Sequence, residues 1–480
     1  MISLNRDSLH CDKSPKNLKI LQFGEGNFLR AFADWMVDIA NENSTISASV
    51  SVVSPRFSDN ASIQALRKQD GLYHVILEGV QGGKPTREIR LVKSIEQVLS
   101  PKVDAAAYEE CITHPDLKLV ISNTTEAGIR YEKEDVTVDY PATFPGKVTN
   151  LLYKRYNKYN GDKQRGLTFV CCELIEDNGA KLKECVMRHI ADNAMPEAFA
   201  QWVNEACAFC DSLVDRIVPG FPAHSINEIH EEIGCDDAMV VKGEFYHLWV
   251  IGGEGYLKAQ ELLPLDKAGL HVHFMPEIKQ FRDKKVRILN GSHTGMVPIA
   301  LQMGCATVLE AFGNSDINRF INEMVATEVL PMIEGDKTEL QAFADGILER
   351  FYNPYVKHML TSIALNSLSK WEARNFPTAR DYRKATGSAA QHEAFTFAAL
   401  LALYAPDSGF EPNDNAEHVA IIHNAFALGD TRATVEAIVN SPIFTVNFEQ
   451  EAPGFIYAAA AHLEQIRAKG MPAALKQFLS

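Results

Sequence analysis

The stretch LKILQFGEGNFLRAFADWMVDI, residues 18–39, decides the fold of this chain. Its first six residues, Leu18 to Phe23, are mainly apolar and predict a short buried strand that runs directly into Gly24-Glu25-Gly26. From Phe28 onward the apolar residues recur at intervals of three and four, which is the periodicity of a helix with one buried face. A strand, a glycine-containing turn and a helix in this order are typical of the phosphate-binding unit of a doubly wound α/β domain.

The glycine turn matches the dinucleotide fingerprint G-x-G-x-x-G in part, because Leu29 stands where the third glycine is expected. The first glycine permits a tight turn, and the second lets the backbone approach a pyrophosphate. An ordinary strand-to-helix turn has the same spacing, so the place of the motif after the first predicted strand is what favours a cofactor. Arg30 is placed to offer its guanidinium to a phosphate. The cofactor residues expected in this segment are Phe23, Gly24, Gly26, Asn27, Phe28 and Arg30.

Further apolar segments predict strands at residues 50–53, 117–121 and 168–172. Strands and helices in alternation predict an α/β fold, with an N-terminal Rossmann-like doubly wound domain built on a parallel sheet. Asn123 and Thr124 follow one of these strands at its carboxyl end, where this fold binds its cofactor. We therefore expect both residues to contact the dinucleotide.

The residue that selects between NAD and NADP is not in its usual place. An acidic residue for the adenosine ribose is expected after the second strand, where this chain has Ser54-Pro55-Arg56, and Asp59 comes too late. Arg56 suits the 2′-phosphate of NADP, and it suits a solvated surface position equally well. We expect NAD as the cofactor, and the sequence leaves NADP open.

From about residue 290 the segments become long and helix-forming, with few β-branched runs. They predict a mostly α-helical second domain, and we find no internal repeat or low-complexity linker before it. We place a dinucleotide-binding domain at residues 1–275 and a substrate and catalytic domain at residues 276–480. The expected helices are 316–334, 337–350, 358–371, 388–404, 415–428 and 453–479.

Composition limits the partners of the protein. The 480 residues carry a formal net charge of −15, which argues against a general nucleic-acid binder. Residues 1–17 contain no apolar run like that of a signal peptide, and the longest apolar stretch, 394–405, is too short to span a bilayer. We therefore expect a cytoplasmic protein with no membrane partner, and a buried helix at 394–405. The sequence does not reveal the oligomeric state.

A second motif, KKVRILNGSHTG at residues 284–295, carries residue types suited to acid–base chemistry without a metal. A desolvated lysine, here Lys285, can titrate at about pH 7–8 and exchange a proton with a carbinol oxygen. The Asn290 amide can stabilise an alkoxide, and His293 can hold the same oxygen by a hydrogen bond. Taken alone, the motif also fits an ordinary helix start with solvated charges. On one straight α-helix Lys285 stands about 140° from Asn290, so Lys285 should precede the helix or the helix should begin late.

Six motifs in chain order resemble the polyol-specific long-chain dehydrogenase/reductase family, which includes mannitol dehydrogenase. The resemblance covers almost the whole chain and implies a Rossmann domain, a helical C-terminal domain and metal-independent hydride transfer. It also implies that Lys285 is the catalytic lysine and that Asn290 and His293 hold the reacting oxygen. The motifs are QFGEGNFLRAF (22–32), QDGLY (69–73), SNTTEAG (122–128), CELIEDNG (172–179), LVDRIVPG (213–220) and KKVRILNGSH (284–293).

The resemblance further assigns part of a substrate pocket. Val214 and Asp215 match a pair that lines this pocket in the family, although Asp215 is equally placed for a salt bridge to a neighbour. Three positions that hold polyol oxygens in relatives differ here. They carry Leu174, Ser362 and Leu365, which implies that polyol contacts have been lost.

A sugar acid needs a cation for its carboxylate, and this chain offers several candidates. Lys370 keeps its family match, and Arg374 lies one helical turn further on. Lys357 and His358 are further candidates. Each of the four also fits a solvated helix position.

Within the family, the motifs resemble most closely the members that interconvert tagaturonate and altronate, and RFYNPYVKHMLTSIALN (350–366) adds to this likeness. We therefore expect NAD(H)-dependent reduction of a keto-uronate to an aldonate, with a small-molecule sugar acid as the partner and no metal. The alternatives with the same chemistry are a fructuronate reductase and a mannitol-type polyol dehydrogenase. A metal-dependent uronate isomerase or epimerase and a non-catalytic cofactor-binding regulator are more distant alternatives. His271 and His273 alternate on an expected strand, but no third ligand has suitable spacing for a metal.

Overall fold

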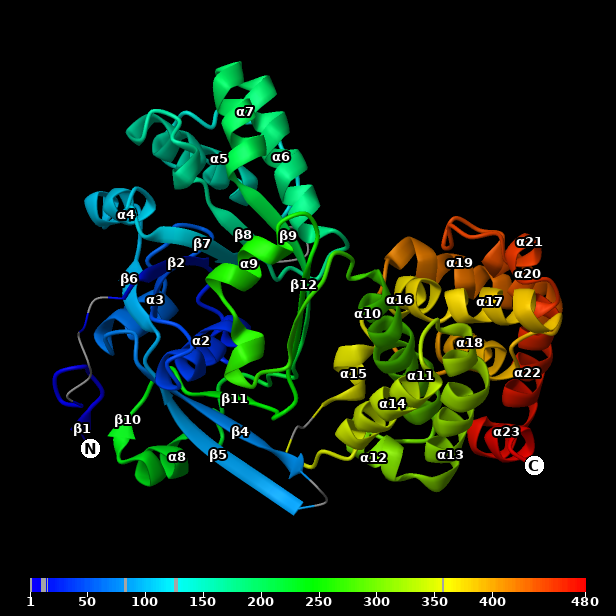
Figure 1. Ribbon diagram of the computed structural model, residues 1–480. Helices are drawn as coiled ribbons and strands as arrows, with labels where there is room; N and C mark the ends of the chain where they lie inside the picture. The colour runs from blue at the N-terminus through cyan, green and yellow to red at the C-terminus, as the bar shows by residue number, and fades with distance from the viewer. Residues whose placement is uncertain (1, 10–13, 15, 82–83, 125–127, 356–357) are drawn as a thin grey trace. The chain divides into compact units, whose positions relative to one another are not determined.

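The structure is a computed structural model that describes residues 2–9, 14, 16–81, 84–124, 128–355 and 358–480. It divides into two compact units, Met1–Ile278 and Lys279–Ser480. In Figure 1 the chain colours run from blue through green in the first unit and from green to red in the second. The expected domain boundary at residues 275/276 lies three residues before the division between the units.

The first unit is built on a twisted sheet to which eight strands of the described residues belong (Figure 1). The run from β6 to β9 is parallel throughout, β12 is antiparallel to β9, and β13 is parallel to β12. The first of these strands in the chain, β2, lies between β3 and β7, which is the strand order of doubly wound dinucleotide-binding domains. The expected α/β fold is therefore confirmed. In sheet order the strands are β13 (Val272–Phe274), β12 (Leu248–Gly252), β9 (Ala208–Asp215), β8 (Thr168–Cys171), β7 (Leu117–Ser122), β2 (Leu18–Phe23), β3 (Ala48–Val53) and β6 (Ile95–Leu99).

Helices cover both faces of this sheet, as the apolar strands require. Ile20 of β2 packs in one buried cluster with side chains of α2 (Ala33–Glu42), α3 (Ala61–Lys68) and α9 (Tyr256–Leu262). Leu21, one residue later, packs in a second cluster on the other face. The helices of that face are α4 (Ala105–Ile112), α5 (Phe144–Lys158), α6 (Asn178–Asp192) and α7 (Glu197–Ala206).

Smaller elements complete the first unit. The hairpin of β4 (Tyr73–Gln81) and β5 (Lys84–Val92) is joined by β11 (Val241–Gly243) in a separate sheet. The remaining elements are β1 (Ile2–Ser3), which pairs with β10 (Cys235–Asp236), and α8 (Ile226–Ile233).

The helix expected to run on from Phe28 is broken, which corrects the sequence-based expectation. It forms α1 (Asn27–Arg30) and then α2. The carbonyl of Arg30 accepts a hydrogen bond from the Tyr73 hydroxyl (2.8 Å), and the carbonyl of Ala31 accepts one from the Arg216 guanidinium (2.6 Å). In a continuous helix these two carbonyls would accept hydrogen bonds from backbone N–H groups. Here they accept hydrogen bonds from side chains that are distant in the sequence.

The second unit is helical, as expected (Figure 1). Two expected helices are each divided in two. Residues 358–371 break at Asn366, whose φ is +52°, and residues 453–479 break at Gly470, whose φ is +80°. The helices are α10 (Lys279–Lys285), α11 (Gly291–Gln302), α12 (Val308–Gly313), α13 (Ser315–Met324), α14 (Lys337–Phe351), α15 (Leu360–Ile363), α16 (Ser367–Arg374), α17 (Phe376–Thr386), α18 (Gln391–Leu403), α19 (Ala416–Phe426), α20 (Thr431–Val439), α21 (Phe448–Glu451), α22 (Phe455–Lys469) and α23 (Met471–Phe478).

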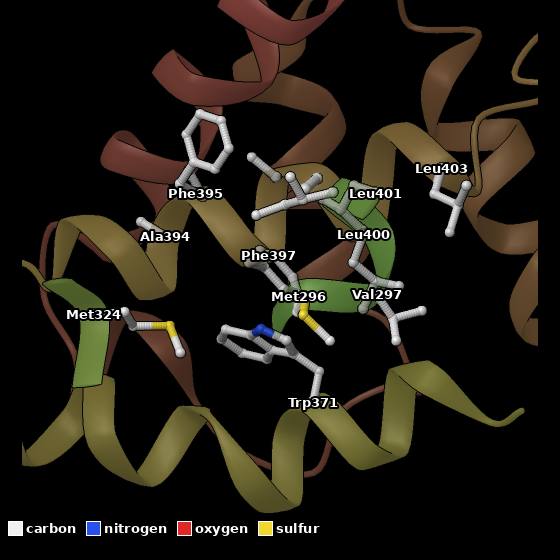
Figure 2. Close-up of a cluster of buried hydrophobic side chains, with 14 of the residues drawn as sticks. Met296, Val297, Met324, Trp371, Ala394, Phe395, Phe397, Leu400, Leu401 and Leu403 are labelled. Carbon is white, nitrogen blue, oxygen red and sulfur yellow. The ribbon is translucent and has the colours of Figure 1, made fainter. Parts of the chain in front are cut away.

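The centre of this unit is α18, in which every residue from Glu393 to Leu403 is buried. This confirms the buried helix expected at 394–405. Figure 2 shows its side chains together with Met296 and Trp371, and the rings of Trp371 and Phe397 lie 4.5 Å apart between centroids. Within the described ranges, none of the helices combines the length and the hydropathy that a membrane-spanning segment requires.

A buried carboxyl group lies within this apolar helix. Glu393 accepts a hydrogen bond from the Asn375 side chain (2.9 Å), which also donates to the carbonyl of Gly291 (3.1 Å). Burial, followed by the nearby charge of Glu328, raises the pKa of Glu393 to about 8. Glu393 is therefore protonated in the folded protein at neutral pH.

This gives a prediction for stability. Between about pH 4.5 and pH 8 the unfolded chain releases the Glu393 proton and the folded chain keeps it, so the contribution of this group to stability falls as pH rises, by about 1.4 kcal/mol per pH unit. Glu393→Gln should remove this dependence. The melting temperature of the variant, measured relative to that of the wild type, should therefore increase as the pH is raised from 5.5 to 8.

The matched control is Glu464→Gln, at an exposed position of α22. Its melting temperature should follow that of the wild type at every pH. A constant difference between Glu393→Gln and the wild type across this range would show that Glu393 titrates normally.

Candidate active site

The carboxyl edge of the parallel sheet brings two of the expected cofactor segments together. Gly24 has a φ of +133°, and a side-chain carbon at this position would lie 3.0 Å from the carbonyl oxygen of Asn123. The Gly24 N–H donates to Val53 (3.0 Å), and the Asn123 N–H donates to Phe23 (3.1 Å). Both the backbone angle and the close approach therefore require glycine at Gly24.

A cavity of about 880 Å³ opens at this edge. Gly24, Gly26, Asn123 and Thr124 line it, and a side-chain carbon on Gly26 would meet no atom within 4 Å. The backbone is thus exposed to a ligand where the fingerprint expects a pyrophosphate. The other lining residues are Glu25, Ser54, Pro55, Arg56, Phe57, Ser58, Asn60, Ser62, Lys102, Gly128, Arg130, Glu132, Tyr140, Pro141, Ala142, Thr143, Phe144 and Lys147.

Four expected cofactor residues do not line this cavity. Phe23 is fully buried beneath it, and Phe28 stacks on Phe32 with ring centroids 4.8 Å apart. Arg30 is directed into the protein, where its guanidinium donates to the carbonyls of Met239 and Glu25 and to the Asn27 side chain. Arg30 and Asn27 therefore hold the shape of the glycine turn, and the structure does not bring Arg30 to a phosphate position.

The cavity beside the segment after β3 is lined by both cations and carboxylates, and Lys147 is the cation that is most buried. The Lys147 ammonium lies 5.1 Å from the centre of the Phe57 ring and donates to the carbonyl of Ala142 (2.6 Å). Burial lowers its pKa to about 8, although Glu134 opposes this shift. Asp59 is engaged by Arg67 (3.1 Å) and does not line the cavity. Lys147 had no sequence signal, because it lies far from the glycine turn along the chain.

Glu173 is a further residue that the sequence did not single out. It is 2% exposed and accepts hydrogen bonds from the Ser122 hydroxyl (3.0 Å) and from the Thr124 N–H (3.0 Å) and hydroxyl (3.1 Å). Burial raises its pKa, and these hydrogen bonds act in the opposite direction. The carboxyl group thereby fixes the loop that carries Asn123 and Thr124.

The expected substrate residues of the first unit lie at the same edge. Val214 and Asp215 are buried and end β9, which runs parallel to β8. Parallel strands present their carboxyl ends at one edge of a sheet, so Asp215 shares that edge with Gly24 and Asn123. Neighbouring Arg216 donates to the carbonyls of Glu244 and Ala31.

In the second unit, a π-helical turn, Val286–Asn290, joins α10 to α11. Lys285 directly precedes this turn, and Asn290 is its last residue. The Gly291 N–H reaches the carbonyl of Val286, five residues back. Such a turn contains one residue more than an α-helical turn, so Lys285 and Asn290 are separated by about 40° and not by about 140°. Counted in the same way, Lys285 and His293 are about 20° apart.

This geometry corrects the expectation that Lys285 precedes the helix or that the helix begins late. The helical backbone continues from Lys279 to Gln302, and the extra residue turns the three side chains toward one face. Lys285 and Asn290 are half-buried, and the Asn290 amide has no side-chain hydrogen bond within the part of the chain that the structure describes.

His293 is held by aromatic contacts. It is 7% exposed, its ring stacks on Phe351 with centroids 4.3 Å apart, and the edge of His358 lies 5.3 Å away. Its Nε2 has no hydrogen-bond partner among the described residues. Burial, followed by the nearby His358, Arg350 and Arg374, lowers the pKa of His293 well below its usual value. The imidazole is therefore neutral at physiological pH.

The expected carboxylate-binding residues differ in their surroundings. Arg374 donates to the hydroxyl of Thr294 (3.2 Å), next to His293, while the Lys370 ammonium donates to the carbonyl of Ile363 (3.0 Å). Lys370 thus links α16 to α15. Lys357 lies outside the described residues.

The family models and known proteins agree with this architecture. The Mannitol dehydrogenase Rossmann domain matches residues 18–263, and the Mannitol dehydrogenase C-terminal domain matches residues 277–467. Altronate oxidoreductase of Bacillus subtilis (strain 168) is 41% identical over 463 residues, which cover 96% of this chain and 95% of that protein. Altronate oxidoreductase of Phocaeicola vulgatus is 37% identical over 485 residues and 100% of both chains.

A solved structure shares the fold along the whole chain. Pseudomonas fluorescens mannitol 2-dehydrogenase, in a ternary complex with NAD and D-mannitol, has a TM-score of 0.76 at 20% identity. The match covers 100% of this chain and 99% of that one. The two domain models and the full-length relatives confirm the resemblance drawn from the motifs: the chain belongs to the mannitol dehydrogenase family.

Proposed function

We propose that this protein is an NAD(H)-dependent oxidoreductase that interconverts the keto-uronate tagaturonate and the aldonate altronate. The observation that carries the chemistry is the alignment of Lys285, Asn290 and His293 by the π turn. The substrate is supported by the full-length similarity to altronate oxidoreductases at 41% and 37% identity.

Lys285 is the proposed acid and base. In the reducing direction its ammonium donates a proton to the oxygen of the forming alkoxide, and in the oxidising direction the neutral amine takes a proton from the hydroxyl. A lysine supplies this proton directly, so the proposal needs no metal ion. Full activity after EDTA treatment is expected, and a strict metal requirement would favour the isomerase or epimerase alternative.

Asn290 and His293 are proposed to hold the reacting oxygen. The Asn290 amide can donate a hydrogen bond to it, as in oxyanion-stabilising sites. The buried Nε2 of neutral His293 lacks a partner among the described residues, and a substrate oxygen would supply one. Because His293 carries no charge, it positions the oxygen and leaves the proton transfer to Lys285.

The cavity lined by Gly24, Gly26, Asn123 and Thr124 fits a dinucleotide, because the uncovered backbone at Gly26 leaves room for a pyrophosphate. When bound, the nicotinamide supplies or accepts the hydride. NAD is the proposed cofactor, and NADP is the alternative that Arg56 and Lys147 favour, since both line the cavity.

The function is tested by following NADH consumption with tagaturonate, fructuronate and fructose in parallel, and by repeating each reaction with NADPH. We expect tagaturonate to be reduced with the highest kcat/KM, and NADH to support the reaction. A preference for fructose would identify a polyol dehydrogenase, and activity with NADPH alone would contradict the proposed cofactor. Absence of turnover with all three would contradict the enzyme assignment.

The role of Lys285 is tested by Lys285→Met, which preserves the length of the side chain and removes its proton. We expect kcat to fall by about 10²- to 10⁴-fold, the usual contribution of a general acid or base. NADH binding, followed by fluorescence, should be retained.

The control is Lys284→Met, at the neighbouring residue whose ammonium lies 5.3 Å from the centre of the Phe281 ring. Its kcat should remain within about threefold of the wild-type value, because Lys284 has no proposed role in proton transfer. Loss of a general acid or base would have a far larger effect. Equal effects of the two substitutions would argue against a catalytic role for Lys285.

A further inference from the structure

Basic side chains from three separate segments lie near His293: Arg350, His358 and Arg374. Phe351, whose ring stacks on His293, directly follows Arg350 at the end of α14, and His358 lies edge-on to the same imidazole. Arg374, at the end of α16, reaches Thr294, the next residue after His293. The causes that lower the pKa values of His293 and His358 are burial and positive neighbours, and no carboxylate is among them.

Arg374 differs from two other inward-facing arginines, Arg155 and Arg287. Arg155 is fully buried and donates to four backbone carbonyls, and Arg287 forms an ion pair with Asp381 (2.7 Å). Within the described residues, Arg374 has one hydrogen bond, to a neutral hydroxyl, and no ion pair. A partly desolvated guanidinium with free donors is unfavourable alone and is stabilised by an anion.

The environment of His293 also indicates a ligand site near Arg374. Its Nε2 is buried and has no partner in the described part of the chain. The Nε2 that has no partner in the described ranges belongs to His293, and the guanidinium that has no ion pair there binds Thr294, the next residue of α11. A ligand that satisfies both groups needs a neutral oxygen and an anionic group on one small molecule, as a keto acid has.

We propose that Arg374, together with His358, binds the carboxylate of the substrate and thereby selects sugar acids over neutral ketoses and polyols. This inference rests on the proposed function, because it assigns a second part of the same substrate. The planar guanidinium can donate two parallel hydrogen bonds to a carboxylate. Thr294 is a positioning residue, since its hydroxyl fixes the guanidinium relative to His293. Ser362 and Leu365 are exposed and offer no comparable charge.

The test compares tagaturonate with tagatose, in which a hydroxymethyl group replaces the carboxylate. With NADH, the wild-type enzyme should prefer tagaturonate. Arg374→Gln should lower kcat/KM for tagaturonate by about 100-fold, the expected effect of losing a charged hydrogen-bonding pair, and should change that for tagatose by less than about threefold. His358→Gln should act in the same direction by about 10-fold.

The control is Arg432→Gln, at an exposed arginine of α20 that pairs with Glu436. It should change neither substrate. Equal losses for tagaturonate and tagatose in Arg374→Gln would overturn the proposal, because they would indicate a general structural defect. An unchanged preference for tagaturonate would overturn it as well.

A binding measurement separates this inference from the proposed reaction. In wild-type enzyme saturated with NAD, altronate should raise the melting temperature and the neutral polyol altritol should not. Arg374→Gln should lose the response to altronate. If wild-type enzyme shows no turnover, the proposed function fails while this response still tests the carboxylate site. No response in the wild type, or an equal one in Arg374→Gln, overturns the site.

Discussion

Lys285, Asn290 and His293 face the same way because the helix that carries them takes one extra residue between Val286 and Asn290. An uninterrupted α-helix would turn the lysine about 140° away from the asparagine, and the proposed proton transfer would then have no route to the oxygen that Asn290 holds. π turns are rare and occur often at functional sites. The proposed acid–base chemistry therefore depends on a local departure from regular helix geometry.

A buried polar network supports that departure. Asn375 holds the carbonyl of Gly291, directly after the π turn, and also binds Glu393. The Glu393 N–H donates in turn to Glu328 (3.0 Å), which lies in a second π turn, Val325–Val329. The two irregular turns are thus connected through hydrogen bonds inside an otherwise apolar core. Glu328 also accepts a hydrogen bond from the His392 N–H (2.8 Å), so the network fixes the start of α18 next to the second π turn.

Much of the fold could be predicted from local sequence. β2 was expected at 18–23 and is Leu18–Phe23, because a compact apolar run followed by glycine is a local signal. The break after Arg30 could not be predicted, since it arises from Tyr73 and Arg216, far away in the chain. The same holds for the break at Asn366, whose N–H donates to the carbonyl of Asn413 (3.0 Å).

The residue types of the candidate site could be predicted from the sequence, but their arrangement in space could be predicted only in part. The motif identified Lys285, Asn290 and His293, but a fixed rotation of 100° per residue cannot reveal a π turn. Arg30 was expected at a phosphate because it follows the glycine turn, whereas the carbonyl of Met239 draws its guanidinium inward. Lys147 and Glu173 act at the cofactor cavity through contacts that only the folded sheet creates.

The most direct test is a crystal structure of the enzyme with NADH and altronate bound. We expect one substrate oxygen to lie within about 3.2 Å of Lys285 Nζ, Asn290 Nδ2 and His293 Nε2 together, the range of good hydrogen bonds. A complex in which Asn290 and His293 contact the oxygen while Lys285 faces elsewhere would contradict the central role of the π turn.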